Sequence, residues 1–322
     1  MQRSTRDSVS GDFVATHPLD PDDARTVAAM RAAVQAVKGK LRGIEARAPF
    51  DALMEGVLPR DGATFKSQTV GGVPGLWVLP AKWRSDEAML HLHGGWFNFG
   101  SARAYRHLVA QLAARVGARS FVPDYRLAPE HPFPAAIDDA LACYRGLDEA
   151  GIRRIAVTGD SAGGNLALVL ASRVSSGAIS ARTALVGAAA LSPITDLTLS
   201  GATYETRADA DPYFTRPQVA ELVGAYLGGA DPEGPLASPL YARLSGLPPV
   251  RIHVGDDEVL LDDSRRYIER AIAAGVDARL DVWMGMPHGF PGSIGKLNAA
   301  AQALDSIGVF LTEKLHADMM KA

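Results

Sequence analysis

The chain has 322 residues, of which 47 % are hydrophobic and 21 % are charged, and this composition excludes a disordered or fibrous protein. Its net charge of −3 gives no electrostatic reason to expect nucleic acid or an anionic membrane as a partner. Its single cysteine, Cys143, excludes an internal disulfide.

No secretory signal is expected at the start of the chain. Residues 1–20 are polar and lack the apolar segment of a secretory signal. The longest apolar run, residues 184–191, is too short to cross a bilayer. We therefore expect a cytoplasmic protein without a membrane partner; whether it forms a homodimer is left open.

The N-terminal part of the chain predicts helices and then a strand pair. The first ten residues look frayed, and a helix is expected from Asp20-Pro21 onward because proline suits the first turn of a helix. Apolar residues then recur every three or four positions: Val27, Met30, Val34, Val37 and Leu41. Residues 64–70 and 76–79 flank two glycine-containing turns and predict an antiparallel pair at a sheet edge.

Strands and helices alternate from residue 89 onward. The expected strands are residues 89–92, 120–122, 155–157, 184–191, 250–254 and 279–283. The expected helices are residues 105–116, 135–146, 162–175, 263–274 and 297–315. Such alternation predicts an α/β fold with a mostly parallel sheet that is covered by helices on both faces.

The alternation stops between residues 192 and 248, a stretch rich in proline, glycine and aromatic residues with one expected helix, 218–227. An insertion at the carboxyl ends of parallel strands lies over the place where such sheets bind ligands. We therefore expect residues 1–55 to form N-terminal cap helices and residues 193–248 to form a cap insertion. Residues 56–192 and 249–322 form the expected core.

A G-x-S-x-G sequence, Gly159-Asp160-Ser161-Ala162-Gly163, lies between an apolar β-branched run and a helix-like stretch. At such a junction this sequence is the nucleophile elbow, a tight turn that exposes the serine hydroxyl for attack. The five letters alone are weak evidence, so the surrounding motifs decide. Ser161 is the candidate nucleophile.

Three other motifs follow predicted strands, and their order supports this interpretation. The sequence His93-Gly94-Gly95-Trp96 precedes the serine, Asp256-Asp257 comes after it, and His288 follows the last strand. Glycine-rich loop, serine, acid and histidine in this order are typical of α/β-hydrolases and of neither chymotrypsin-like nor subtilisin-like enzymes.

His288 is the candidate general base, because it lies on a glycine-flanked loop after the last strand. His253 lies within an apolar strand and is interpreted as a packed core residue.

Several acidic residues compete to orient the histidine. We favour Asp257 over Asp256, with Glu258 third. Asp262 and Asp263 open a helix and are explained as capping and first-turn charges.

The oxyanion of an acyl-transfer reaction needs N–H donors. The backbone of Ala162 is expected to supply one, and the loop of Gly94, Gly95 and Trp96 the others.

Aromatic residues are expected to line the substrate site: Trp96, Phe97, Tyr204 and Phe214. Alternatively, these rings only pack the cap on the core.

Three segments together resemble the hormone-sensitive-lipase-like esterases, bacterial family IV. They are His93-Gly94-Gly95, residues 124–136 (DYRLAPEHPFPAA) and residues 159–165 (GDSAGGN). The resemblance runs from about residue 89 to residue 288. It implies a triad of Ser161, Asp257 and His288, an oxyanion hole at Gly94, Gly95 and Ala162, and a cap.

The sequence departs from the family pattern at two places. Trp96 replaces the third glycine of the loop, and the usual Asp-Pro-Leu around the acid reads Asp257-Glu258-Val259. Within residues 124–136, we expect Asp124, Arg126 and Glu130 to form a charged network that braces the loop.

The predicted function is that of a serine carboxylesterase acting on short-chain or small-molecule esters through an acyl-serine intermediate. No metal-ligand spacing is visible, and neither metal nor cofactor is expected. The same triad would serve a lactone, carbamate or amide bond. A non-catalytic receptor on the same scaffold is disfavoured because such receptors lose the serine or the histidine, and both are present.

Overall fold

The computed structural model describes residues 13–317, so the expectation for the first ten residues lies outside the described part of the chain. Within that part, the strands form one nine-stranded sheet of order β1-β9-β8-β7-β6-β4-β5-β3-β2. The strands are β1 Val14–His17, β2 Thr64–Val70, β3 Val73–Leu79, β4 Glu87–Leu92, β5 Ser120–Pro123, β6 Arg154–Asp160, β7 Ala184–Leu191, β8 Val250–Gly255 and β9 Ala278–Trp283. In this spatial order, neighbouring strands from β1 as far as β5 pair in parallel, whereas β3 pairs antiparallel with both β5 and β2. The predicted mostly parallel α/β fold is confirmed.

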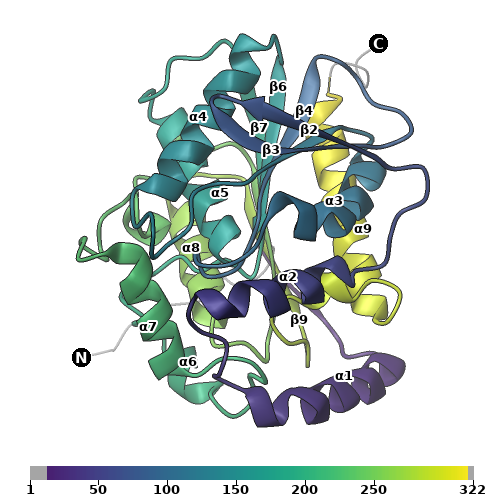
Figure 1. Cartoon of the computed structure of the whole chain (residues 1–322), viewed down its shortest axis with the longest axis vertical. Helices are drawn as coiled ribbons and strands as arrows, with labels where there is room; N and C mark the ends of the chain where they lie inside the picture. Colours follow the sequence, from purple (N-terminus) through teal and green to yellow (C-terminus); the bar gives the residue numbers. More distant parts are fainter. Residues whose placement is uncertain (1–12, 318–322) are drawn as a thin grey trace, which may run out of the picture.

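Helices cover both faces of the sheet (Figure 1). They are α1 Pro21–Val34, α2 Arg47–Glu55, α3 Ala102–Val116, α4 Ala135–Glu149, α5 Ala162–Ser175, α6 Thr203–Thr206, α7 Arg216–Leu227, α8 Leu261–Ala273 and α9 Asn298–Leu315. Successive side chains of a strand point to opposite faces. Accordingly, Leu90 and Leu92 of β4 pack in the cluster that contains α4, α5 and α8, and Met89 packs in the cluster of α3 and α9.

Strand β1 is a feature that sequence reasoning missed. It adds to the sheet edge in parallel with β9, and the ring of His17 stacks on Trp283 with centroids 3.8 Å apart. His17 Nε2 also lies 2.7 Å from a carboxylate oxygen of Asp281. Strand β1 has only four residues, and more than 250 positions separate it from β9 in the sequence. Its pairing depends on the assembled sheet edge, so the local sequence does not predict this strand.

The N-terminal helices and the segment between β7 and β8 lie at the same end of the molecule (Figure 1). The Gly39 N–H donates to the Tyr213 carbonyl at 2.9 Å, and Gln218 Nε2 donates to the Leu41 carbonyl at 2.7 Å. Gln218 also completes a capping box with Thr215 at the start of α7. Two segments far apart in the sequence therefore pack on each other.

No helix among residues 13–317 combines the length and the hydropathy that a membrane span requires.

Candidate active site

Ser161 stands in the turn between β6 and α5, with φ 52° and ψ −118°. Such a backbone conformation is strained for a non-glycine residue and is typical of functional turns. The flanking glycines are required by close approach. A Cβ on Gly163 would lie 1.9 Å from the Leu92 carbonyl oxygen, and one on Gly159 would lie 2.2 Å from the Gly163 carbonyl oxygen. The predicted strand–turn–helix context of the motif is confirmed.

Hydrogen bonds hold the strained turn in place. The Ser161 N–H donates to the Leu191 carbonyl at 2.8 Å, and the Ser161 carbonyl accepts from Asn165 N–H at 3.1 Å. Ser161 is 4 % exposed. Ala162 begins α5, and the first N–H groups of a helix have no acceptor within it. These groups are therefore suited to receive a developing negative charge.

His288 lies on the loop after β9, and its Nδ1 is 2.8 Å from Oε2 of Glu258. With Nδ1–H donated to the carboxylate, Nε2 is the nitrogen that can accept a proton. Burial by itself lowers the pKa of His288, but the charge and hydrogen bond of Glu258, with the charges of Asp211 and Asp160, raise it above its ordinary value. The imidazolium form is therefore favoured by three acidic neighbours.

Glu258 is fully buried, and both of its carboxylate oxygens have hydrogen-bond partners. Oε1 accepts from Ser192 Oγ at 2.6 Å and from Gly255 N–H at 2.7 Å, which leaves Oε2 to His288. Ser192 has a positive φ of 46°, so strain is also present at this contact.

Asp257, the acid favoured from the sequence, does not contact His288. Its carboxylate pairs with Arg31 of α1, and Asp256 accepts from Gly285 N–H. The hydrogen bond between Gly255 N–H and Glu258 curls the turn after β8, so that the side chain of Glu258 returns over the strand end. The expectation that Asp257 orients His288 does not agree with this geometry, in which Glu258 is the carboxylate that contacts His288.

One signal in the sequence could have found this acid. Glu258-Val259-Leu260 places leucine two residues after the acid, as Asp-Pro-Leu does, whereas Asp257-Glu258-Val259 does not.

The loop after β4 lies against the elbow, but its amides are not equivalent. The Gly94 N–H donates to Asp160 Oδ1 at 3.0 Å, so it is occupied by a carboxylate. Gly95 (φ 114°) and Trp96 (φ 55°) both adopt positive φ angles. The expectation that Gly94 donates to the oxyanion is therefore corrected, and Gly95, Trp96 and Ala162 remain the candidates.

Tyrosine hydroxyls brace this loop. Tyr105 donates to Asp160 Oδ2 at 2.9 Å, and Tyr125 donates to the His93 carbonyl at 2.7 Å. The Ala128 N–H adds a bond of 2.9 Å to the Phe97 carbonyl.

The charged network expected within residues 124–136 is not formed among its own members. Asp124 accepts from Ala102 N–H at the start of α3, and Arg126 pairs with Asp139. Glu130 pairs with Arg47 of α2, whose guanidinium also donates to the Asn98 carbonyl at 2.9 Å.

Two of the four aromatic residues expected at the substrate site lie near His288. The rings of Phe214 and His288 are 5.0 Å apart, and those of Phe214 and Trp96 are also 5.0 Å apart, both edge to face. Phe97 has a different neighbour: its fully buried ring stacks on Tyr226 with centroids 3.7 Å apart.

Tyr204 is also placed elsewhere. It is buried in α6, where burial and the charges of Asp263, Asp196 and Asp211 raise the pKa of its hydroxyl well above the ordinary value. No ring contact with Phe214, Trp96 or His288 is found for it within residues 13–317.

Comparisons with known proteins agree with this geometry. Residues 89–292 match a family model described as the α/β hydrolase fold. An acetyl-hydrolase of Streptomyces hygroscopicus is 38 % identical over 246 residues, which cover 76 % of this chain and 81 % of that protein. An esterase of Acinetobacter venetianus is 35 % identical and covers 73 % and 77 %.

Solved structures of esterases also resemble this chain. The crystal structure of an esterase from the bacterial hormone-sensitive lipase family superposes with a TM-score of 0.85 at 36 % identity, covering 92 % of this chain and 99 % of that chain. The chain belongs to the α/β-hydrolase fold family, and within it to the hormone-sensitive-lipase-like esterases.

Proposed function

We propose that this carboxylic ester hydrolase cleaves short-chain or small-molecule esters through an acyl intermediate on Ser161. His288 is the general base, and Glu258 orients it. The observation that carries the proposal is the 2.8 Å contact between His288 Nδ1 and Glu258, on loops at the same end of the sheet as the strained serine.

The reaction follows from these positions. As Ser161 Oγ bonds to the ester carbonyl carbon, His288 Nε2 takes the hydroxyl proton, and the carbonyl electron pair moves to oxygen. The N–H groups of Gly95, Trp96 and Ala162 donate to that oxyanion. Collapse breaks the bond to the alcohol oxygen, which receives the proton from His288. Water then repeats the sequence on the acyl-enzyme and regenerates Ser161.

Trp96 and Phe214 limit the acyl group in this proposal. Their rings touch each other, and Phe214 touches His288, so bulky apolar groups stand next to the reacting carbonyl. Acyl chains of about two to six carbons would be cleaved best, because a longer chain would have to displace these rings, and each further methylene that fits adds only about 1 kcal/mol to offset that cost. The relative from Streptomyces hygroscopicus is named an acetyl-hydrolase, which is consistent with a small acyl group.

We also propose that residues 21–55 and 193–248 form a cap and that residues 56–192 and 249–317 form the core. Strand β1 belongs to this core and not to the expected cap, because it pairs with β9 in the sheet. The hydrogen bonds of Gly39 to Tyr213 and of Gln218 to Leu41 support this division. So does Phe214, which brings the insertion against His288.

Covalent capture tests the mechanism. The full chain is incubated with a 4-nitrophenyl phosphonate, and intact mass and peptide mapping locate the adduct. We expect one phosphonyl group on Ser161, formed in proportion to the loss of esterase activity, and none on Ser161→Ala. Inactivation with the adduct on another residue would overturn the proposal.

A further inference from the structure

Asp211 is a second buried carboxylate whose charge acts on His288, and it belongs to no motif in the sequence. It lies in the insertion, between α6 and α7, and is fully buried. Burying a charged group costs free energy unless hydrogen bonds and opposite charges compensate for the lost water. The hydrogen-bond partners of the Asp211 carboxylate therefore indicate its role.

The three hydrogen-bond partners found for the Asp211 carboxylate within residues 13–317 are all backbone N–H donors. Oδ1 accepts from Tyr213 at 2.8 Å and from Phe214 at 3.0 Å, on its own loop. Oδ2 accepts at 3.0 Å from Val259, the residue after Glu258. One carboxylate therefore fastens the insertion to the turn that carries the acid.

This attachment places an aromatic ring on the histidine. The Phe214 amide is held by Asp211, and its ring lies 5.0 Å from that of His288 at an interplanar angle of 71°. Because Val259 directly follows Glu258, the acid and the ring that flank His288 are both anchored through Asp211.

We propose that Asp211 is a positioning residue of the active site, which holds Phe214 and the Glu258 turn around His288 and places a second negative charge beside the histidine. The inference rests on the triad proposed above and adds to it a residue that never touches substrate.

The charges around His288 come from three separate elements. Glu258 follows β8, Asp160 ends β6, and Asp211 comes from the insertion; all three raise the pKa of His288. The pKa of the Asp211 carboxyl is raised above its ordinary value, with burial as the largest cause, against its backbone donors and the charge of His288, which lower it. Because these partners donate or are cationic, they favour the carboxylate form of Asp211.

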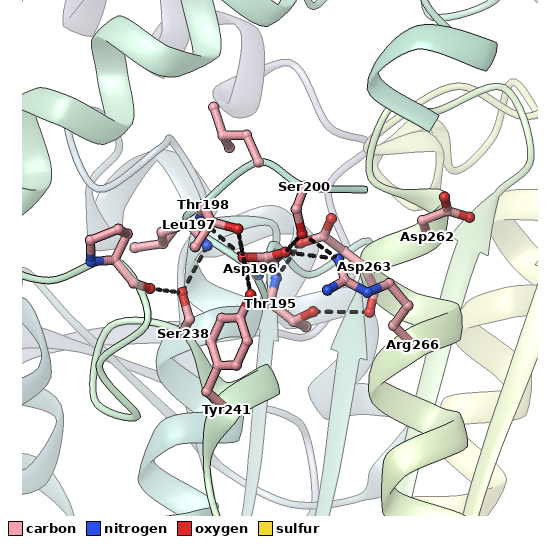
Figure 2. A network of polar contacts seen from close by, with 12 residues as sticks. Thr195, Asp196, Leu197, Thr198, Ser200, Ser238, Tyr241, Asp262, Asp263 and Arg266 are labelled. Carbon is pink, nitrogen blue, oxygen red and sulfur yellow. Dashed lines mark hydrogen bonds and ion pairs between the residues drawn. The ribbon is translucent and has the colours of Figure 1, made fainter. Parts of the chain in front are cut away.

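Asp196 provides a matched control. It is likewise a fully buried carboxylate of the insertion, and Figure 2 shows it among Thr198, Ser200, Tyr241 and Arg266. Arg266 of α8 donates to it at 2.7 Å, so Asp196 also fastens the insertion to the core. Within residues 13–317, no hydrogen bond or ion pair joins Asp196 to His288.

The test compares the pH profiles of kcat/KM for wild type, Asp211→Asn and Asp196→Asn on 4-nitrophenyl acetate. Asparagine at position 211 removes the negative charge. It also places either an amide NH₂ group, which cannot accept, or an amide oxygen, which is a poorer acceptor than a carboxylate, opposite the Val259 N–H. We expect the acid limb of Asp211→Asn to move to lower pH and kcat to fall about tenfold. Asp196→Asn should lower the melting temperature and leave the acid limb in place.

An acid limb of Asp211→Asn that coincides with that of wild type would overturn the inference, as would equal displacement in both variants. If Asp211→Asn does not accumulate as folded protein, Asp211→Glu takes its place because it keeps the charge. The acid limb should then be retained while kcat falls; a displaced limb with unchanged kcat would contradict the inference.

Failure of the underlying mechanism is recognised separately. Wild type that is not phosphonylated on Ser161 refutes the triad, whereas normal labelling with an unshifted Asp211→Asn profile refutes only the role of Asp211.

Discussion

Glu258 and His288 lie 2.8 Å apart, although Asp257, the neighbour of Glu258 in the chain, was the more conventional acid. The pairing is selected by the surroundings. Ser192 and Gly255 donate to one oxygen of Glu258, while Asp257 is turned toward the guanidinium of Arg31. A fully buried carboxylate with this many donors has little freedom to reorient.

This pairing predicts that Glu258→Gln loses far more activity than Asp257→Asn. An amide at position 258 favours the wrong imidazole tautomer, and the loss of kcat should reach up to about 10⁴-fold. Asp257→Asn breaks only a partly exposed ion pair, so kcat should stay within about threefold of wild type. Steady-state kinetics on 4-nitrophenyl acetate measure both, and losses of equal size would show that the acid has been misassigned.

The pH dependence of the reaction follows from the raised pKa of His288. The general base must be neutral, so kcat/KM should rise with pH and reach half its plateau above 6.5, the ordinary histidine value. The contribution of His288 to the free energy of unfolding has the opposite pH dependence. Because the pKa of His288 is raised in the folded state, this stabilisation is fully present below the unfolded-state pKa and is lost as pH rises through the folded-state pKa. A kcat/KM profile from pH 5 to 9 checks the first statement, and half-maximal activity below pH 6.5 would contradict it.

Trp96 and Phe97 are neighbours with opposite expected roles. Trp96 contacts Phe214, which contacts His288, whereas Phe97 stacks on Tyr226. Trp96→Ala should therefore move the preferred acyl chain of 4-nitrophenyl esters beyond six carbons. Phe97→Ala should lower stability by about 3–5 kcal/mol, as for a buried phenylalanine, and leave the preference unchanged. An unchanged chain-length preference in Trp96→Ala would indicate that these rings only pack the cap.

Asp263 should make stability depend on pH near neutrality. Burial first, and then the charge of Asp196, raise its pKa to about 7, against the opposing backbone bonds of Thr195 and Asp196. Because the folded-state pKa is raised, the stabilising contribution is present below the unfolded value, about 3.8, and is lost as pH rises through about 7.

The melting temperature of wild type relative to Asp263→Asn should therefore fall between pH 5 and pH 8. Asp262→Asn, on the partly exposed neighbour, is the control for a general change of charge in α8. A difference between wild type and Asp263→Asn that is constant across this range would show that Asp263 keeps one protonation state in the folded protein.

Features that depend on neighbouring residues were predictable from the sequence alone. The alternation of apolar runs with helical periodicity led to the parallel sheet, since each element is specified by its own residues. The elbow at Ser161 was predictable for the same reason, because Gly159 and Gly163 are needed for contacts within one short turn and with the adjacent strand.

Only the tertiary structure decided the direction of side chains in irregular segments. Three consecutive acids follow β8, and the bond from Gly255 to Glu258 selects which one returns to His288. Asp211 lies 48 residues before Val259 in the chain and accepts a hydrogen bond from its N–H. No local sequence pattern predicts this contact. Such choices depend on which donors and charges the assembled fold brings within hydrogen-bond distance, because a buried carboxylate is stable only where they are present.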